Sequence, residues 1–177
     1  MRAGIVCLAA VAFAAMPSVP TRGDDTAKVA AKELVGLFIQ GCLRFAGDAP
    51  GLRDWATHLG LTLLAAGGQR AFLGGASGIV FDASNQVGKF VLVSEDGGSC
   101  SAVAEMASGP VVISELELDL SAAKVAVAAT ADKVDREEAT LKHREYQVSL
   151  GKRGWLLVVS VVRDPAGGRA MVTAKSN

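Results

Sequence analysis

The strongest β-strand signal in the chain is WLLVVSVV at residues 155–162, where Ser160 is the single polar residue. A strand that is apolar on both faces is typical of the middle of a sheet covered on both sides. The stretch before it, residues 141–150, alternates between apolar and polar side chains. We therefore expect a central strand beside a half-buried one, whose apolar face carries Tyr146, Val148 and Leu150.

Four more stretches have strand patterns and extend the predicted sheet to about six strands. They are residues 78–82, 89–95, 99–106 and 169–175. The second and third are separated by Asp96-Gly97-Gly98, a good tight-turn sequence. Short connections of this kind favour a mostly antiparallel sheet.

Helical periodicity marks two segments before these strands. In residues 25–45, apolar side chains recur at spacings of three and four. A shorter helix follows, with Pro50 in its first turn and Gly60 after its end. We expect residues 60–77 to form an ordered loop, because pairs of glycines punctuate them. The expected inward faces are Ala31, Val35, Phe38, Cys42 and Phe45 in the first helix, and Leu52, Trp55, Ala56 and Leu59 in the second.

Residues 110–128 fit two structures. Residues 115–120 alternate as a strand would, but the helix-favouring composition and Pro110 at the start indicate a helix. We predict the helix, with one face made of Val112, Leu116, Leu120, Ala123 and Val127. The predicted fold class is therefore α+β, with a mostly antiparallel sheet of about six strands, two N-terminal helices and one central helix.

The N-terminus has the pattern of an export signal. Arg2 precedes an apolar run over residues 3–13, and Ala12-Phe13-Ala14 fits the small-x-small cleavage rule. The run is too short for a membrane-spanning helix, which needs about 20 apolar residues. We predict a bacterial signal peptide at residues 1–14, a mobile leader at 15–25 and a single domain at 26–177, located in the periplasm or secreted.

Composition excludes some partners. The chain has 18 basic and 18 acidic residues, and half of its residues are hydrophobic. This composition supports a packed core but lacks the basic excess of a nucleic-acid binder. After residue 14, no segment is long and apolar enough to span a bilayer. We expect no nucleic-acid partner and no membrane span in the mature chain, and the sequence does not predict an oligomeric state.

Two cysteines follow the predicted cleavage site, Cys42 and Cys100. In an oxidising compartment such a pair most simply forms a disulfide. The competing hypothesis is a catalytic thiol at Cys42 with His58 as its base. An apolar helix face disfavours that hypothesis, because a thiol in apolar surroundings stays protonated.

No motif predicts a cofactor or a metal site. The two histidines, His58 and His143, have no ligand partner at the close spacing typical of zinc sites. The strand at 141–150 places His143 and Glu145 on the face opposite Tyr146, where they could exchange protons with a substrate. The favoured interpretation of this pair is the solvated face of a half-buried strand.

Five short motifs are spread along the chain: FL-x-G at 72–75, G-x-V at 78–80, DGG-x-C at 96–100, HREY at 143–146 and AM-x-TA at 170–174. Together they resemble a group of small secreted proteobacterial proteins of uncharacterised function. The resemblance covers most of residues 30–175. It implies export and a single domain, and it implies no activity and no functional residue.

We predict from these features a small non-enzymatic binding or inhibitory protein of the bacterial envelope, whose partner is another envelope protein. The alternative hypothesis is an envelope hydrolase that uses Cys42 or the His143/Glu145 pair. A third hypothesis is a carrier of a small ligand, which requires a sizeable apolar pocket beneath the sheet.

Overall fold

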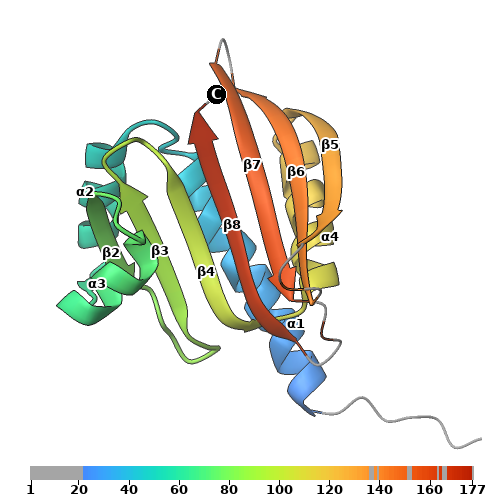
Figure 1. Cartoon of the computed structure of the whole chain (residues 1–177), viewed down its shortest axis with the longest axis horizontal. Helices are drawn as coiled ribbons and strands as arrows, with labels where there is room; N and C mark the ends of the chain where they lie inside the picture. The colour runs from blue at the N-terminus through green and yellow to red at the C-terminus, as the bar shows by residue number, and fades with distance from the viewer. Residues whose placement is uncertain are drawn as a thin grey trace, which may run out of the picture.

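The computed structural model describes residues 22–135, 138, 140–150, 153–162, 164 and 167–176. The predicted signal peptide at 1–14 and the predicted leader up to residue 21 lie outside these residues. The described part is α+β, with four α-helices and one antiparallel sheet of eight strands (Figure 1). The predicted class is confirmed, whereas six strands and three helices are too few.

The first half of the chain contains three helices, a π-helical turn and four strands. The helical elements are α1 (Arg22–Leu37), η1 (Phe38–Leu43, the π-helical turn), α2 (Ala49–His58) and α3 (Ala66–Leu73). The strands are β1 (Thr62–Leu63), β2 (Gly78–Asp82), β3 (Phe90–Glu95) and β4 (Cys100–Ala107).

The second half contains α4 (Gly109–Ala122), β5 (Ala126–Val134), β6 (Leu141–Leu150), β7 (Arg153–Val162) and β8 (Gly168–Ser176). The strand order is β1-β2-β3-β4-β8-β7-β6-β5, and every pair is antiparallel. After β4, α4 carries the chain to the far edge of the sheet, and hairpins bring it back until β8 pairs with β4. β7 is therefore an interior strand, as predicted.

One face of the sheet is covered by α1 and α4, which lie behind the strands in Figure 1. The predicted inward faces of both helices are largely confirmed. In α1 and η1 the buried side chains include Ala31, Leu34, Val35, Phe38 and Cys42, and in α4 they are Val112, Leu116 and Leu120. Each large apolar side chain buried in this way stabilises the fold by about 1.5–3 kcal/mol. Phe45 is half-buried, and Leu59, expected on the inner face of α2, is 57% exposed.

The predicted loop at residues 60–77 is wrong, because these residues contain β1 and α3. One side chain of α3, Gln69, fixes this segment to β2. Gln69 accepts a hydrogen bond from the Val80 amide at 2.8 Å and donates one to the Val80 carbonyl at 2.9 Å. It also donates to the Leu64 carbonyl at 3.1 Å. Gln69 thus takes the place of a further strand residue at the edge of β2.

The predicted central helix is confirmed as far as Ala122, and its extension through residue 128 is wrong. Lys124 has a φ of 54°, a left-handed conformation that ends the helix. β5 begins two residues later, so Val127 lies on a strand and not on the helix face. An apolar residue at this position fits both the helical period and the strand period, which is why the sequence pattern misled.

The two cysteines lie at disulfide distance, as predicted, with their Cα atoms 5.2 Å apart. Cys42 in η1 is fully buried, and Cys100 at the start of β4 is 5% exposed. The π-helical turn is marked by the Arg44 amide, which donates to the Ile39 carbonyl five residues earlier. The pair therefore ties the helical layer to the middle of the sheet.

A second tie joins α2 to the end of β3. The Arg53 guanidinium donates to the Ser94 hydroxyl and to the Ser94 carbonyl, both at 3.1 Å, and forms an ion pair with Asp96 in the β3–β4 turn. Ser94 is fully buried, so its hydroxyl depends on this partner.

Replacing both cysteines, Cys42→Ala with Cys100→Ala, should lower the free energy of unfolding by about 2–4 kcal/mol, because the cross-link restricts the unfolded chain. Denaturant unfolding of the purified chain measures this loss. Reductant should lower the unfolding midpoint of the wild type toward that of the double variant. It should leave the midpoint of the double variant unchanged. An unfolding midpoint of the wild type that is unchanged by reductant would contradict the cross-link.

Arg53→Ala should lower the free energy of unfolding by about 1–3 kcal/mol, because it leaves the buried Ser94 hydroxyl without this donor. Arg70→Ala is the matched control, since it removes an exposed arginine from α3. Denaturant unfolding compares the two variants. Equal stabilities for both would show that the Arg53 contacts contribute nothing measurable.

Candidate functional site

The sheet face opposite α1 and α4 has no described helix over β4, β8, β7 and β6, and Figure 1 is viewed from this side. Alternation places one set of side chains there, because Tyr146, Leu157 and Val172 point to the helices. We call this set the open face: Ser101, Val103, His143, Glu145, Leu156, Val158, Ser160, Val162, Met171 and Thr173.

The middle of the open face is mostly apolar. Leu156, Val158 and Val162 of β7 and Met171 of β8 are half-buried, and Val103 of β4 is buried. β7 is therefore apolar on both faces, as the sequence indicates. The expectation that both faces are covered is wrong for the described residues, because α1 and α4 lie on one side only. The described helices therefore cover only one of the two apolar faces of β7.

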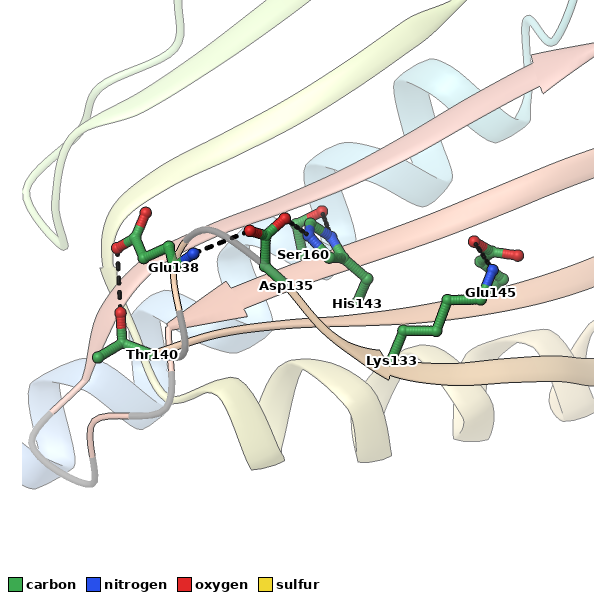
Figure 2. Close-up of polar contacts among 7 residues, drawn as sticks. All are labelled: Lys133, Asp135, Glu138, Thr140, His143, Glu145 and Ser160. Carbon is green, nitrogen blue, oxygen red and sulfur yellow. Dashed lines mark hydrogen bonds and ion pairs between the residues drawn. The ribbon is translucent and has the colours of Figure 1, made fainter.

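A chain of polar contacts crosses the side of the open face nearest β5. His143 and Ser160 are direct cross-strand partners in β6 and β7. His143 Nδ1 lies 2.8 Å from Ser160 Oγ, and Nε2 lies 3.3 Å from Asp135 Oδ2 (Figure 2). Asp135 is held in turn by the Glu138 amide, which donates to it at 2.9 Å. In the tautomer that carries its hydrogen on Nε2, the His143 ring donates a hydrogen bond to Asp135, and Nδ1 accepts one from the Ser160 hydroxyl.

Glu145 has a different partner. Lys133 Nζ of β5 lies 3.1 Å from Glu145 Oε1 (Figure 2). His143 and Glu145 therefore share a face, as predicted, but each is bonded to another residue. The acid–base grouping that the structure assembles around His143 is Asp135 and Ser160.

The order Asp135, His143, Ser160 is that of an acid, a base and a nucleophile, in which the base takes the hydroxyl proton. The surroundings of Ser160 are less suited to catalysis. Its side chain is only 6% exposed. β7 is paired on both sides at this residue, so its amides are engaged in the sheet and do not point at a developing oxyanion.

A second polar cluster lies on the helix side of β6. The Tyr146 hydroxyl donates to Glu117 Oε1 of α4 at 2.8 Å, and Arg144 Nη1 donates to the same oxygen at 3.1 Å. Asp132 of β5 accepts from Arg144 at 3.3 Å and pairs with Lys142 at 2.9 Å. These contacts attach α4 and β5 to the sheet. The alternation of HREY places Arg144 on the same face as Tyr146, and this signal was available in the sequence.

The thiol hypothesis loses its nucleophile, because Cys42 is buried at disulfide distance from Cys100. His58 Nδ1 lies 2.7 Å from the Asp54 carbonyl within its own helix. The described residues contain no group of three or more His, Cys, Asp or Glu side chains that could hold a metal ion. Among the same residues, no helix has the length and apolar character needed to cross a membrane.

The carrier hypothesis finds a hollow beside the sheet, not beneath it. Pro110 and Ile113 of α4 and Val161 and Val162 of β7 line a partly open space of about 490 Å³ at the end of β7. Between α1, α4 and the sheet, apolar side chains pack into one core.

Comparison of the chain with protein-family models, with curated proteins and with solved structures found no match.

The single tyrosine of the chain offers a direct test of the helix-side cluster. Burial, followed by the hydrogen bond to Glu117, raises the pKa of Tyr146 above its ordinary value. Because the pKa is higher in the folded state, the neutral phenol stabilises the fold fully below about pH 10, and this contribution is lost as the pH rises through the folded pKa.

An ultraviolet titration of the phenolate should therefore show a native midpoint above that of the unfolded chain. Glu117→Gln should move the native midpoint part of the way back, because it removes the negative charge but leaves Tyr146 buried. Glu115→Gln is the matched control on the same helix. Equal midpoints in the native and unfolded chains would contradict the buried contact.

Proposed function

We propose that this chain is an exported domain that binds another protein of the bacterial envelope through its open face. The observation that carries the proposal is the half-buried apolar surface of β7 and β8 on the side that α1 and α4 leave uncovered. Contiguous exposed apolar surface on a folded domain marks an interaction site. In this proposal the partner packs against the apolar face of β7 that α1 and α4 leave uncovered.

Cross-strand pairing makes this surface contiguous. Met171 lies between Val103 of β4 and Ser160 of β7, and Thr173 lies between Ser101 and Val158. The Ser101 and Thr173 hydroxyls are 2.8 Å apart, so these two groups satisfy each other and need no water. Burying apolar side chains, or hydroxyls that are already hydrogen-bonded to each other, against a partner costs little desolvation free energy.

The charged residues at the borders of the open face indicate which kind of partner fits it. The side nearest β5 carries the Lys133–Glu145 ion pair and His143. β8 adds Arg169 and Lys175, which are exposed. An apolar centre with a charged border matches the usual anatomy of a protein interface. A protein surface with an apolar ridge between polar groups fits it better than a small ligand does.

Export is supported by the signal-peptide pattern of residues 1–14 and by the buried cysteine pair, which an oxidising compartment favours. The envelope is accordingly the compartment in which a partner should be sought.

Photo-crosslinking in the periplasm tests this function. A photoreactive residue at Leu156, on the open face, should capture one specific protein, and the same residue at Leu59, directly after α2, should not. Excess unlabelled chain should compete with the capture, whereas Val158→Asp chain should compete about tenfold less well, as expected for loss of a central apolar contact. Equal capture from both positions, or equal competition by both chains, would overturn the proposal.

A second candidate function, acyl hydrolysis, is supported by the Asp135–His143–Ser160 chain. In that reaction Ser160 Oγ attacks an ester carbonyl while its proton passes to His143 Nδ1. The leaving alkoxide then takes this proton, and water releases the acyl group. A fluorophosphonate probe should label Ser160, and His143→Ala should reduce the labelling by about 100-fold or more. Ser101, another hydroxyl of the open face, is the internal control, and an unlabelled Ser160 excludes this function.

A further inference from the structure

A hollow between the helices lies away from the open face. It is lined by α1, by α2 and the residues just after it, and by the loop between β2 and β3 with the first residue of β3. Its volume of about 320 Å³ falls within the range of small-molecule sites, about 300–1,000 Å³. None of its lining residues belongs to the open face. The hollow is therefore a candidate binding site of its own.

Gly36 lies on the wall of this hollow, inside the continuous helical stretch of α1 and η1. A glycine inside a helix destabilises it relative to alanine. Gly41 has a packing reason, because a Cβ there would come 2.9 Å from the Trp55 ring. A Cβ at Gly36 would meet only the Gln40 side chain, at 4.0 Å. Packing of the described residues therefore does not require a glycine at position 36, whereas an unfilled hollow does.

Three polar side chains of the hollow have hydrogen-bonding groups to spare. Glu33 and Gln40 are exposed, and neither side chain has a hydrogen-bond or ion-pair partner among the described residues. Asn85 accepts hydrogen bonds from the Val87 and Gly88 amides at 2.8 and 3.3 Å, which leaves its NH₂ group with no partner in the described part of the chain. The hollow thus offers both donors and acceptors to a ligand.

An aromatic ring is held in place beside these polar groups. Trp55 lines the hollow, and the edge of its six-membered ring lies against Gly41. The centroids of the Phe45 and Trp55 rings are 5.9 Å apart. Leu59, which is 57% exposed, adds apolar surface to the same hollow. Packing therefore fixes the indole before any ligand arrives, which lowers the entropic cost of binding.

The lining disfavours three other classes of ligand. Lys32, the basic residue of the hollow, is paired with Glu115 of α4 at 3.2 Å, so an anion meets no unpaired cation there. A cation would find only the exposed Glu33 carboxylate, and one exposed ion pair contributes little. A hydrocarbon chain would bury the polar groups of Glu33, Gln40 and Asn85 without partners, which costs free energy.

A neutral sugar matches this lining. Its hydroxyl groups both donate and accept hydrogen bonds, as one carboxylate and two amides require. The C–H groups of a pyranose ring form an apolar face, and an indole offers a large flat apolar surface to it. We propose that the hollow binds a neutral saccharide, with one sugar ring on Trp55 and its hydroxyls bonded to Glu33, Gln40 and Asn85. The site lies apart from the open face, so it does not depend on the proposed function.

Nuclear magnetic resonance of the purified, isotope-labelled chain tests this site, because the two tryptophans, Trp55 and Trp155, each give one indole N–H signal. Trp155→Phe identifies which signal belongs to which ring. Chitobiose or maltose at millimolar concentrations should shift the Trp55 signal in a saturable way and leave the signal of the buried Trp155 unchanged. Tighter binding of chitobiose would assign the site to acetamido sugars, and tighter binding of maltose to plain hexoses.

Gly36→Leu should raise the dissociation constant at least about tenfold, because the new side chain occupies the space of the sugar. Its unfolding midpoint should not fall, because leucine favours a helix more than glycine does. Gly23→Leu is the matched control on α1. Gly23 lies outside the hollow, an added Cβ there meets nothing within 4 Å, and the dissociation constant should stay unchanged.

Gln40→Ala should raise the dissociation constant about three- to tenfold through the loss of a hydrogen bond. Gln86→Ala, which changes an exposed residue that follows Asn85 but does not line the hollow, should leave it unchanged. The proposal is overturned if neither sugar shifts the Trp55 signal, if both indole signals shift alike, or if the folded Gly36→Leu chain binds as the wild type does.

Discussion

The pairing of β4 with β8 is the contact on which the rest of the structure depends. It joins two strands about 70 residues apart in the chain and unites the two halves of the sheet. Small side chains line its helix face, among them Ala102, Ala104, Ala170 and Ala174, and they let α1 lie close across the junction. Cys100 pairs with Ala174 across this junction, so the buried Cys42–Cys100 pair ties the same junction to the helical layer.

This arrangement divides the sheet into two chemically different faces. On the helix side, apolar side chains of α1, α4 and the sheet pack into one core, and the Tyr146–Glu117 contact satisfies a buried hydroxyl of β6. On the open face, β7 and β8 present apolar side chains to which the described helices add nothing. This uncovered apolar face is the reason for proposing a bound partner there.

The hydrogen-bonded group at His143 shows how a flat sheet limits chemistry. Cross-strand pairing brings His143 and Ser160 together, and a loop residue completes the chain. The same pairing occupies the backbone amides around Ser160, which an acyl-transfer site needs for its oxyanion. This geometry is the reason why recognition is proposed as the first function and acyl hydrolysis as the second.

Local patterns in the sequence determined the fold class, the buried faces of α1 and α4, the tight turn before Cys100 and the cysteine pair. These features depend on residue spacing, or on the two cysteines that remain when Cys7 is set aside with the predicted signal peptide. Only the tertiary structure decided that Gln69 orders α3, that Val127 belongs to a strand and that one face of β7 stays uncovered. It alone also joined Asp135 to His143 and Ser160. Each of these features depends on which distant segments become neighbours in the fold. Strand order is set by the packing of the whole chain, and the local periodicity of the sequence does not reveal it.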